Sequence, residues 1–368
     1  MESVVAGRLP SPAFWQGKRV FLTGHTGFKG GWLALWLAAL GARVHGFALP
    51  PPTRPSLFVT AHLDDIVAHE IGDIRDAARL KASLRHCAPD IVIHMAAQPL
   101  VLHSYAEPVE TYATNVMGTV HLLEAVRGCD TVLATLIVTS DKCYENRDSI
   151  WGYRECDRMG GHDPYSSSKG CAELVTAAYA GSFFAGSGRA LGSVRAGNVI
   201  GGGDWARDRL MTDLIGALLE GRAPVLRAPG AVRPWQHVLD PLAGYLLAIE
   251  ALVAAPKAGA AWNFGPDPAS EVTVREIADR LSVLWGDDIR PVPADSTARG
   301  QEARLLTLDS TKARRELGWR PRWALERTLA ETVLWYRAFQ AGADMRQVML
   351  GQIADYGRSR PEPAMELA

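Results

Sequence analysis

The sequence predicts an α/β fold, in which a doubly wound parallel sheet with helices on both faces carries a smaller C-terminal α/β lobe. The first observation is a short apolar strand at residues 18–23, which leads through a glycine-rich turn into an apolar helix at residues 31–40. The second is the near-continuous apolar run at residues 90–95, which is typical of a strand in a parallel sheet. The third is the alternation of strands and helices up to about residue 184, which predicts parallel crossover units.

Composition narrows the class of protein. The chain has 368 residues and a formal net charge of -1, so no basic excess indicates a nucleic acid or a membrane surface as partner. The five cysteines show no paired metal-ligand spacing, and an odd, scattered set suits a reducing compartment. No signal peptide is evident, and the apolar helix at residues 31–40 is about half as long as a membrane span. We therefore expect a cytoplasmic enzyme without a bound metal.

The chain divides at a glycine-rich loop, residues 197–205, which we interpret as the boundary between cofactor and substrate parts. The predicted parts are a sheet domain over residues 12–189, segments 190–200 and 230–265 that partly rejoin it, a substrate lobe over residues 201–356, and flexible tails at residues 1–11 and 357–368.

The glycine-rich turn after the first strand has three glycines at three-residue spacing. Gly24 allows a tight turn, Gly27 lets the backbone approach a pyrophosphate, and Gly30 lets the helix pack on the strand. The phosphates would then sit at the positive end of the helix. This arrangement predicts a dinucleotide-binding (Rossmann) fold. The residues expected to line the pyrophosphate are Gly24, Thr26, Gly27, Phe28, Lys29 and Gly30.

The second strand, residues 43–48, lacks the acidic residue that usually follows it and binds the ribose hydroxyls. Leu49 and three prolines stand there instead, with Arg54 beyond. The residues alone therefore leave NAD and NADP both open.

The next strand ends are predicted to contact the rest of the cofactor. Asp73, with Ile74, is placed either to accept a hydrogen bond from the adenine amino group or to cap the following helix. Ala96, Ala97 and Gln98 are residues at a strand end against which a cofactor could lie flat. Asn115, on a long helix at about residues 108–126, either orders a catalytic water or is simply buried.

The catalytic candidates lie on two segments. Tyr165 and Lys169 are four residues apart and therefore share one helix face, where the ammonium should lower the pKa of the phenol. Such a tyrosine can take a proton from a sugar hydroxyl while a hydride leaves the same carbon. Ser140, Asp141 and Lys142 follow the strand at residues 134–139, at the sheet edge where ligands bind in doubly wound folds.

The substrate candidates come later in the chain. Arg233 and His237 belong to a stretch that either grips a diphosphate or forms a surface salt bridge. Asn198, in the glycine-rich loop, and Arg209 and Leu210, at the start of the next helix, complete the expected substrate site.

These motifs occur in one order that resembles the extended short-chain dehydrogenase/reductase family over almost the whole chain. Four segments, residues 55–58, 139–146, 160–165 and 233–238, resemble the nucleotide-sugar 4,6-dehydratases within it. The resemblance implies NAD as cofactor, CDP-glucose as substrate, and a homodimer or dimer of dimers. The dimer would pair helices near residues 108–126 and 165–184 of two chains.

The resemblance also implies a mechanism. Tyr165 takes the proton from the hydroxyl on carbon 4 as a hydride passes to NAD, with Ser140 bonding that hydroxyl. A base then removes the proton on carbon 5, Asp141 protonates the hydroxyl leaving carbon 6, and the hydride returns to carbon 6. Lys142 is either that base, with a pKa lowered by burial near other cations, or a cation that stabilises the enolate. His103 occupies a position where an arginine is expected.

Two other functions share this fold. A nucleotide-sugar 4-epimerase needs no carboxylic acid at carbon 6, so the pair Asp141 and Lys142 argues against it. A non-catalytic cofactor sensor has no need of Tyr165, Lys169 and Asp141 together.

Overall fold

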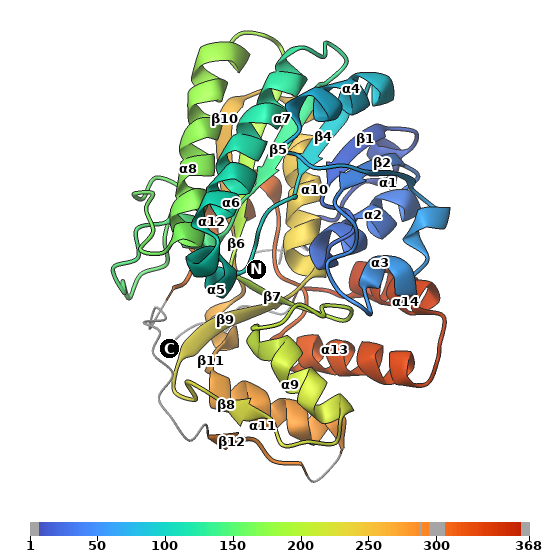
Figure 1. The fold of residues 1–368 in the computed structure, drawn as a ribbon, viewed down its shortest axis with the longest axis vertical. Helices are drawn as coiled ribbons and strands as arrows, with labels where there is room; N and C mark the ends of the chain where they lie inside the picture. The colour runs from blue at the N-terminus through green and yellow to red at the C-terminus, as the bar shows by residue number, and fades with distance from the viewer. Residues whose placement is uncertain (1–6, 287–288, 294–305, 362–368) are drawn as a thin grey trace, which may run out of the picture.

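The computed structural model describes residues 7–286, 289–293 and 306–361. Within these ranges the main sheet has seven strands in the order β10-β6-β5-β4-β1-β2-β3, and every neighbouring pair is parallel (Figure 1). The predicted doubly wound fold is therefore confirmed. The strands of this sheet are β1 (Arg19–Thr23), β2 (Arg43–Ala48), β3 (Ala68–Ile71), β4 (Ile91–His94), β5 (Ala134–Val138), β6 (Ala190–Ala196) and β10 (Ala258–Phe264).

The strand order reverses between β1 and β4, which lie side by side. At such a switch point the loops after the two strands part to opposite faces and leave a crevice at the carboxyl edge of the sheet. The glycine-rich turn follows β1, and the loop that contains Gln98 follows β4. The fold therefore places the predicted cofactor residues around this crevice.

Helices cover both faces of the sheet because successive strand residues point to opposite sides. In β1, Val20 and Leu22 pack into one apolar core with α2 and α10, whereas Phe21 packs into another with α4 and α7. The helices flanking the sheet are α2 (Phe28–Ala39), α4 (Ala77–Cys87), α6 (Pro108–Tyr112), α7 (Gly118–Arg127), α8 (Pro164–Tyr179) and α10 (Leu239–Ala254). The short helices are α1 (Pro12–Trp15), α3 (Leu57–Thr60), α5 (Val101–Ala106) and α12 (Thr311–Leu317).

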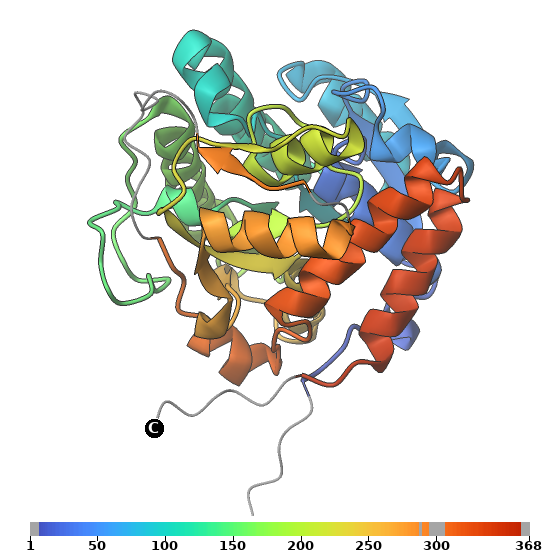
Figure 2. The ribbon, with the colours of Figure 1, turned by 90° about the horizontal axis from the view of Figure 1, so that it is seen from below.

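The C-terminal lobe lies beyond the carboxyl edge of the main sheet (Figure 1). It contains a sheet of order β11-β9-β7 and the two-stranded sheet β12-β8. Figure 2 shows the two C-terminal helices of the lobe, α13 and α14, side by side. Of the segments predicted to return to the main sheet, β6 and β10 do so, whereas β7 and β9 belong to the lobe. The lobe elements are β7 (Asn198–Ile200), β8 (Val225–Leu226), β9 (Val232–His237), β11 (Glu271–Thr273), β12 (Val292–Pro293), α9 (Leu210–Leu219), α11 (Val274–Trp285), α13 (Leu325–Gln340) and α14 (Met345–Arg358).

Three details differ from the sequence predictions. The helix after the glycine turn begins at Phe28 rather than at residue 31. Residues 7–11, predicted as part of a flexible tail, are held in place, because Arg8 and the backbone N–H of Ser11 both bond to Glu250. Helix α14 was not predicted at all. Residues 357–358 of the second predicted tail are the end of this helix. Residues 1–6 and 362–368 of the two predicted tails lie outside the described residues.

Candidate active site

The glycine-rich turn has the shape that a dinucleotide pyrophosphate requires. Gly24 has a φ of +80°, and a Cβ there would lie 2.7 Å from the backbone nitrogen of Ala96. A Cβ on Gly30 would lie 2.1 Å from the carbonyl oxygen of Gly24, so neither position accepts a side chain. No side chain caps α2 at Gly27, which leaves the first backbone N–H groups of the helix available to an anion. The turn therefore fits the predicted cofactor.

The Lys29 side chain lies among the catalytic candidates. Its Nζ donates a hydrogen bond to the Tyr245 hydroxyl at 2.8 Å and lies 5.0 Å from the centroid of that ring. Burial, together with the charges on Lys169 and Arg209, lowers the pKa of Lys29 to about 7. An amine with a lowered pKa therefore extends from the cofactor turn into the centre of the site, which the glycine spacing alone did not predict.

His25, in the same turn, is a buried residue that the sequence analysis did not single out. Its Nε2 is 2.7 Å from Nδ1 of His69, and its ring packs edge-on against Phe58. Burial lowers the pKa of His25 to about 3, so His25 is neutral, and its contact with His69 packs the turn on β3.

The residues predicted at the adenosine end are both occupied by protein contacts. The Asp73 carboxylate accepts hydrogen bonds from the backbone N–H of Arg75 at 2.8 Å and from its guanidinium at 2.6 Å. The cap of α4 is Asp76, so the alternative of Asp73 as a helix cap is wrong. Ile74 is buried and packs against Gly118.

Asn115 ties the loop after β4 to the catalytic helix. It lies in a π-helical turn, Ala113–Met117, between α6 and α7. Its Oδ1 accepts from the backbone N–H of Gln98 at 2.8 Å, and its Nδ2 donates to the Gln98 carbonyl at 3.0 Å and to Ser168 Oγ at 2.8 Å. Both amide hydrogens thus bond to protein groups, which argues against Asn115 as the ligand of a catalytic water. Its π-turn is typical of a functional position.

The predicted tyrosine–lysine pair lies on the first turns of α8. Asp163 caps this helix by accepting from the backbone N–H of Ser166 at 2.9 Å, and Pro164 occupies its first position. Tyr165 and Lys169 are both buried, and Lys169 Nζ lies 6.0 Å from the centroid of the Tyr165 ring. The helix thus presents both side chains to one space.

The pKa of Tyr165 differs from the prediction. Burial raises the pKa of the Tyr165 phenol, and the main opposing influences are the charge on Lys142 and a hydrogen bond with Ser140. Lys169 is itself so buried that its pKa falls to about 8. Lys142 rather than Lys169 is therefore the main cation that favours the Tyr165 phenolate.

Asp141 is at the centre of the acid–base cluster. It is 2 % exposed, accepts a hydrogen bond from Ser140 Oγ at 2.7 Å, and lies 3.4 Å from Lys142 Nζ. Its charge also influences the pKa of Tyr165 and of Tyr245. The structure therefore brings the predicted catalytic residues to one place: Ser140, Asp141, Lys142, Tyr165 and Lys169.

The structure contradicts the interpretation of Lys142 as a base with a lowered pKa. Burial acts to lower the pKa of Lys142, but the neighbouring charges of Asp141 and Tyr165 outweigh it, so the net shift is upward. Its side chain also remains 33 % exposed, which limits the cost of desolvation. Lys142 is a cation in this site.

Two of the predicted substrate residues, Arg209 and Arg233, lie near the catalytic residues. Arg233 is close enough to Lys142 to affect its pKa, and Arg209, paired with Asp204 at 2.8 Å, acts in the same way on Tyr165. Asn198 and Leu210 are half-buried, at the starts of β7 and α9.

His237 is not a substrate residue. It is fully buried between Trp32 and Trp323, and its Nδ1 accepts from the backbone N–H of Leu239 at 3.3 Å. Burial lowers its pKa to about 3, so it is a neutral core residue.

His103, where an arginine was expected, bonds through Nε2 to the exposed Glu110 at 2.9 Å.

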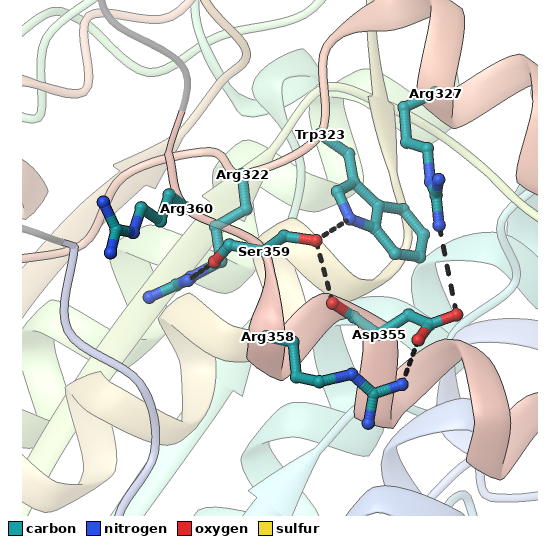
Figure 3. Close-up of a pocket in the computed structure, with 7 residues that line it drawn as sticks. All are labelled: Arg322, Trp323, Arg327, Asp355, Arg358, Ser359 and Arg360. Atoms are coloured by element: carbon teal, nitrogen blue, oxygen red, sulfur yellow. Dashed lines mark hydrogen bonds and ion pairs between the residues drawn. The ribbon is translucent and has the colours of Figure 1, made fainter.

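A separate cavity of about 460 Å³ lies at the C-terminal end of the lobe and contains none of the predicted site residues. Figure 3 shows three of its arginines turned toward protein partners: Arg322 toward the Ser359 carbonyl, and Arg327 and Arg358 toward Asp355. Because these cations already bond within the chain, we do not place the active site there.

Two features bear on the class of protein. Among the described residues, no helix combines the length and the apolar character that crossing a membrane requires. In the same part of the chain, no cluster of three or more histidine, cysteine, aspartate or glutamate side chains is arranged to hold a metal ion.

Fold and site together define an extended short-chain dehydrogenase/reductase. A family described as GDP-mannose 4,6 dehydratase matches residues 21–332. CDP-glucose 4,6-dehydratase from Salmonella typhimurium is 52% identical over 349 residues, which are 93% of this chain and 97% of that protein. A dTDP-glucose 4,6-dehydratase from Xanthomonas campestris is 29% identical and covers 86% of this chain and 92% of its own length. The chain therefore belongs to the GDP-mannose 4,6-dehydratase family of nucleotide-sugar dehydratases.

Solved structures agree with this fold. The dTDP-glucose 4,6-dehydratase DesIV from Streptomyces venezuelae, solved with NAD, has a TM-score of 0.74 and 27% identity, over 89% of this chain and 99% of that chain. UDP-glucose 4-epimerase from Thermotoga maritima has a TM-score of 0.77 and 24% identity, over 87% of this chain and 99% of that chain.

Proposed function

We propose that this protein is an NAD-dependent CDP-glucose 4,6-dehydratase that forms CDP-4-keto-6-deoxy-glucose. The observation that carries the proposal is the buried Asp141 beside Tyr165, because a carboxylic acid next to the oxidation base is needed for elimination and not for epimerisation. The 52% identity with the Salmonella enzyme supports the choice of reaction and substrate.

The cofactor fits the chain at the glycine turn. The tight backbone at Gly24 and Gly30 and the uncapped start of α2 suit its pyrophosphate, and the loop at Ala96, Ala97 and Gln98 borders the crevice. NAD supplies a hydride acceptor for carbon 4 that later returns the hydride to carbon 6.

The chain's own groups move the protons. Tyr165 takes the proton of the hydroxyl on carbon 4, with Ser140 bonding both the tyrosine and the incoming oxygen. The Asp141 carboxylate takes the proton from carbon 5, next to the new ketone, and passes it to the hydroxyl that leaves carbon 6 as water. Arg209 and Arg233 are placed to hold the diphosphate, because guanidinium groups bind phosphate oxygens in two-pronged fashion.

We assign Lys142 the role of a cation that stabilises the enolate, rather than that of the base at carbon 5. Lys142→Arg keeps the charge but cannot accept a proton at any working pH. We expect this variant to retain turnover within roughly tenfold of the wild type, and Lys142→Met to lose about a hundredfold or more. Steady-state kcat for both variants checks this, and an arginine variant as inactive as the methionine variant would restore the base role.

The function itself is tested with a panel of CDP-, dTDP-, GDP- and UDP-hexoses followed by mass spectrometry of the products. We expect the loss of one water from CDP-glucose alone. An unchanged mass with every donor would exclude dehydration, and loss of water from a different donor would reassign the substrate.

We also propose that the enzyme works as a homodimer, or as a dimer of dimers, through helices α6, α7 and α8. These neighbouring helices expose apolar side chains to solvent, among them Val109 at 80 % exposure and Leu174 at 60 %. Phe183, just after α8, continues this surface and lies under Arg127 of α7. An apolar surface of this kind is typical of a protein–protein interface.

A further inference from the structure

A buried ion pair lies directly behind the catalytic residues and has no role in the mechanism above. Glu173 on α8 and Arg195 on β6 bond through two hydrogen bonds, from Nε at 2.9 Å and from Nη2 at 2.8 Å. Both side chains are 4 % exposed. A buried pair of this kind rarely adds net stability over a well-packed apolar pair, which favours a positional role.

Glu173 connects the two segments that carry the reaction. It lies four residues beyond Lys169 and eight beyond Tyr165, so all three share one face of α8. On the other side, Thr139 Oγ1 donates to the Glu173 carboxylate, and Thr139 directly precedes Ser140 and Asp141. The carboxylate therefore links the helix that carries the base to the strand end that carries the acid.

Arg195 holds the opposite end of the acid segment. Its Nη1 donates to the Tyr144 hydroxyl at 2.5 Å, and its guanidinium stacks 5.0 Å from the centroid of that ring. Tyr144 in turn donates to Asn263 Oδ1 at 2.8 Å. Since Thr139 and Tyr144 flank residues 140–143, one ion pair fixes both ends of the segment that contains Ser140, Asp141 and Lys142.

We propose that Glu173 and Arg195 are positioning residues, which set the separation of Tyr165 and Asp141 so that oxidation and elimination act on one sugar. The proposal rests on the proposed function. It assigns no contact with substrate or cofactor to either residue. The reason for the link is geometric, because a displacement of about 1 Å at a catalytic group can cost on the order of a hundredfold in rate.

The chain offers a matched pair of substitutions. Thr139→Val removes the hydrogen bond that joins the acid segment to Glu173, with almost no change of shape. Ser193→Ala removes another hydrogen bond to the same carboxylate, at 2.7 Å, but Ser193 lies on β6, outside the segment that carries Ser140, Asp141 and Lys142. If the network only stabilises the fold, the two variants should have equal effects on activity.

We expect Thr139→Val to lower kcat roughly 10- to 100-fold while KM for the sugar nucleotide stays within about threefold. The reduced cofactor should accumulate during turnover, because oxidation continues while elimination slows, and its absorbance reports this directly. Ser193→Ala should keep kcat within about threefold and accumulate no reduced cofactor. Thr139→Ser, which keeps the hydroxyl, should restore the wild-type rate.

Equal kinetics for Thr139→Val and Ser193→Ala, with the wild type active, would overturn the positioning role and leave the proposed function intact. An inactive wild type would instead contradict the proposed function. If Thr139→Val does not fold, Tyr144→Phe applies the same test at the other end of the segment. That variant should accumulate reduced cofactor, and normal turnover by it would overturn the proposal.

Discussion

Replacing Tyr165 by phenylalanine should abolish every step of the reaction, with kcat falling at least roughly a thousandfold. The phenol is the group that takes the proton from the hydroxyl on carbon 4, and no later step can begin until that carbon is a ketone. The ring is buried, and phenylalanine fills nearly the same space, so the fold should be retained. Neither keto product nor reduced cofactor should form when substrate is added.

The control for this experiment is binding. Circular dichroism should match the wild type, and the variant should bind CDP-glucose and NAD with affinities close to those of the wild type. Appreciable formation of reduced cofactor by Tyr165→Phe would mean that another group removes the proton.

Replacing Asp141 by asparagine should stop the reaction at a different point. Asparagine keeps the size and the hydrogen bond with Ser140 but cannot supply a proton to the hydroxyl on carbon 6. Oxidation at carbon 4 should continue, so the absorbance of reduced nicotinamide should rise to about one equivalent per site and persist. The release of dehydrated product should fall roughly 10²- to 10⁴-fold.

The two variants therefore distinguish the roles of the two residues. If Asp141→Asn behaves like Tyr165→Phe and forms no reduced cofactor, then Asp141 is required for oxidation and is not specifically the acid at carbon 6. If Asp141→Asn releases dehydrated product at the wild-type rate, another group is the acid.

The main sheet and the glycine turn were predictable because local physics determines them. Apolar runs such as residues 90–95 have few alternatives to a buried strand, and only glycine fits where Gly24 and Gly30 approach other backbone atoms. The face shared by Tyr165 and Lys169 follows from helix periodicity alone.

What the sequence did not predict depends on contacts between distant segments. His237 looks polar in the chain, yet Trp32 and Trp323 enclose it in the folded protein. The direction of the Lys142 pKa shift depends on two opposing effects: burial lowers the pKa, and the charges of Asp141 and Tyr165 raise it. The spacing of residues along the chain does not determine which effect is larger.

The long-range network around Glu173 shows the same limit. Its partners are Thr139, just after β5, and Ser193 and Arg195 on β6, and no local pattern in the chain relates them to α8. Helix α14 was also missed, and it packs against α13 and α2, which are distant from it in the chain or continuous with it only through a turn.

The central claim is that Tyr165 and Asp141 act on one hexose and that the hydride from carbon 4 is returned to carbon 6. The most direct test is turnover of CDP-glucose carrying deuterium on carbon 4, followed by mass spectrometry and NMR of the product. We expect a product that has lost one water and carries the deuterium in its new methyl group at carbon 6. A product of unchanged mass that keeps the deuterium on carbon 4, or a dehydrated product whose deuterium has passed to solvent, would contradict this account.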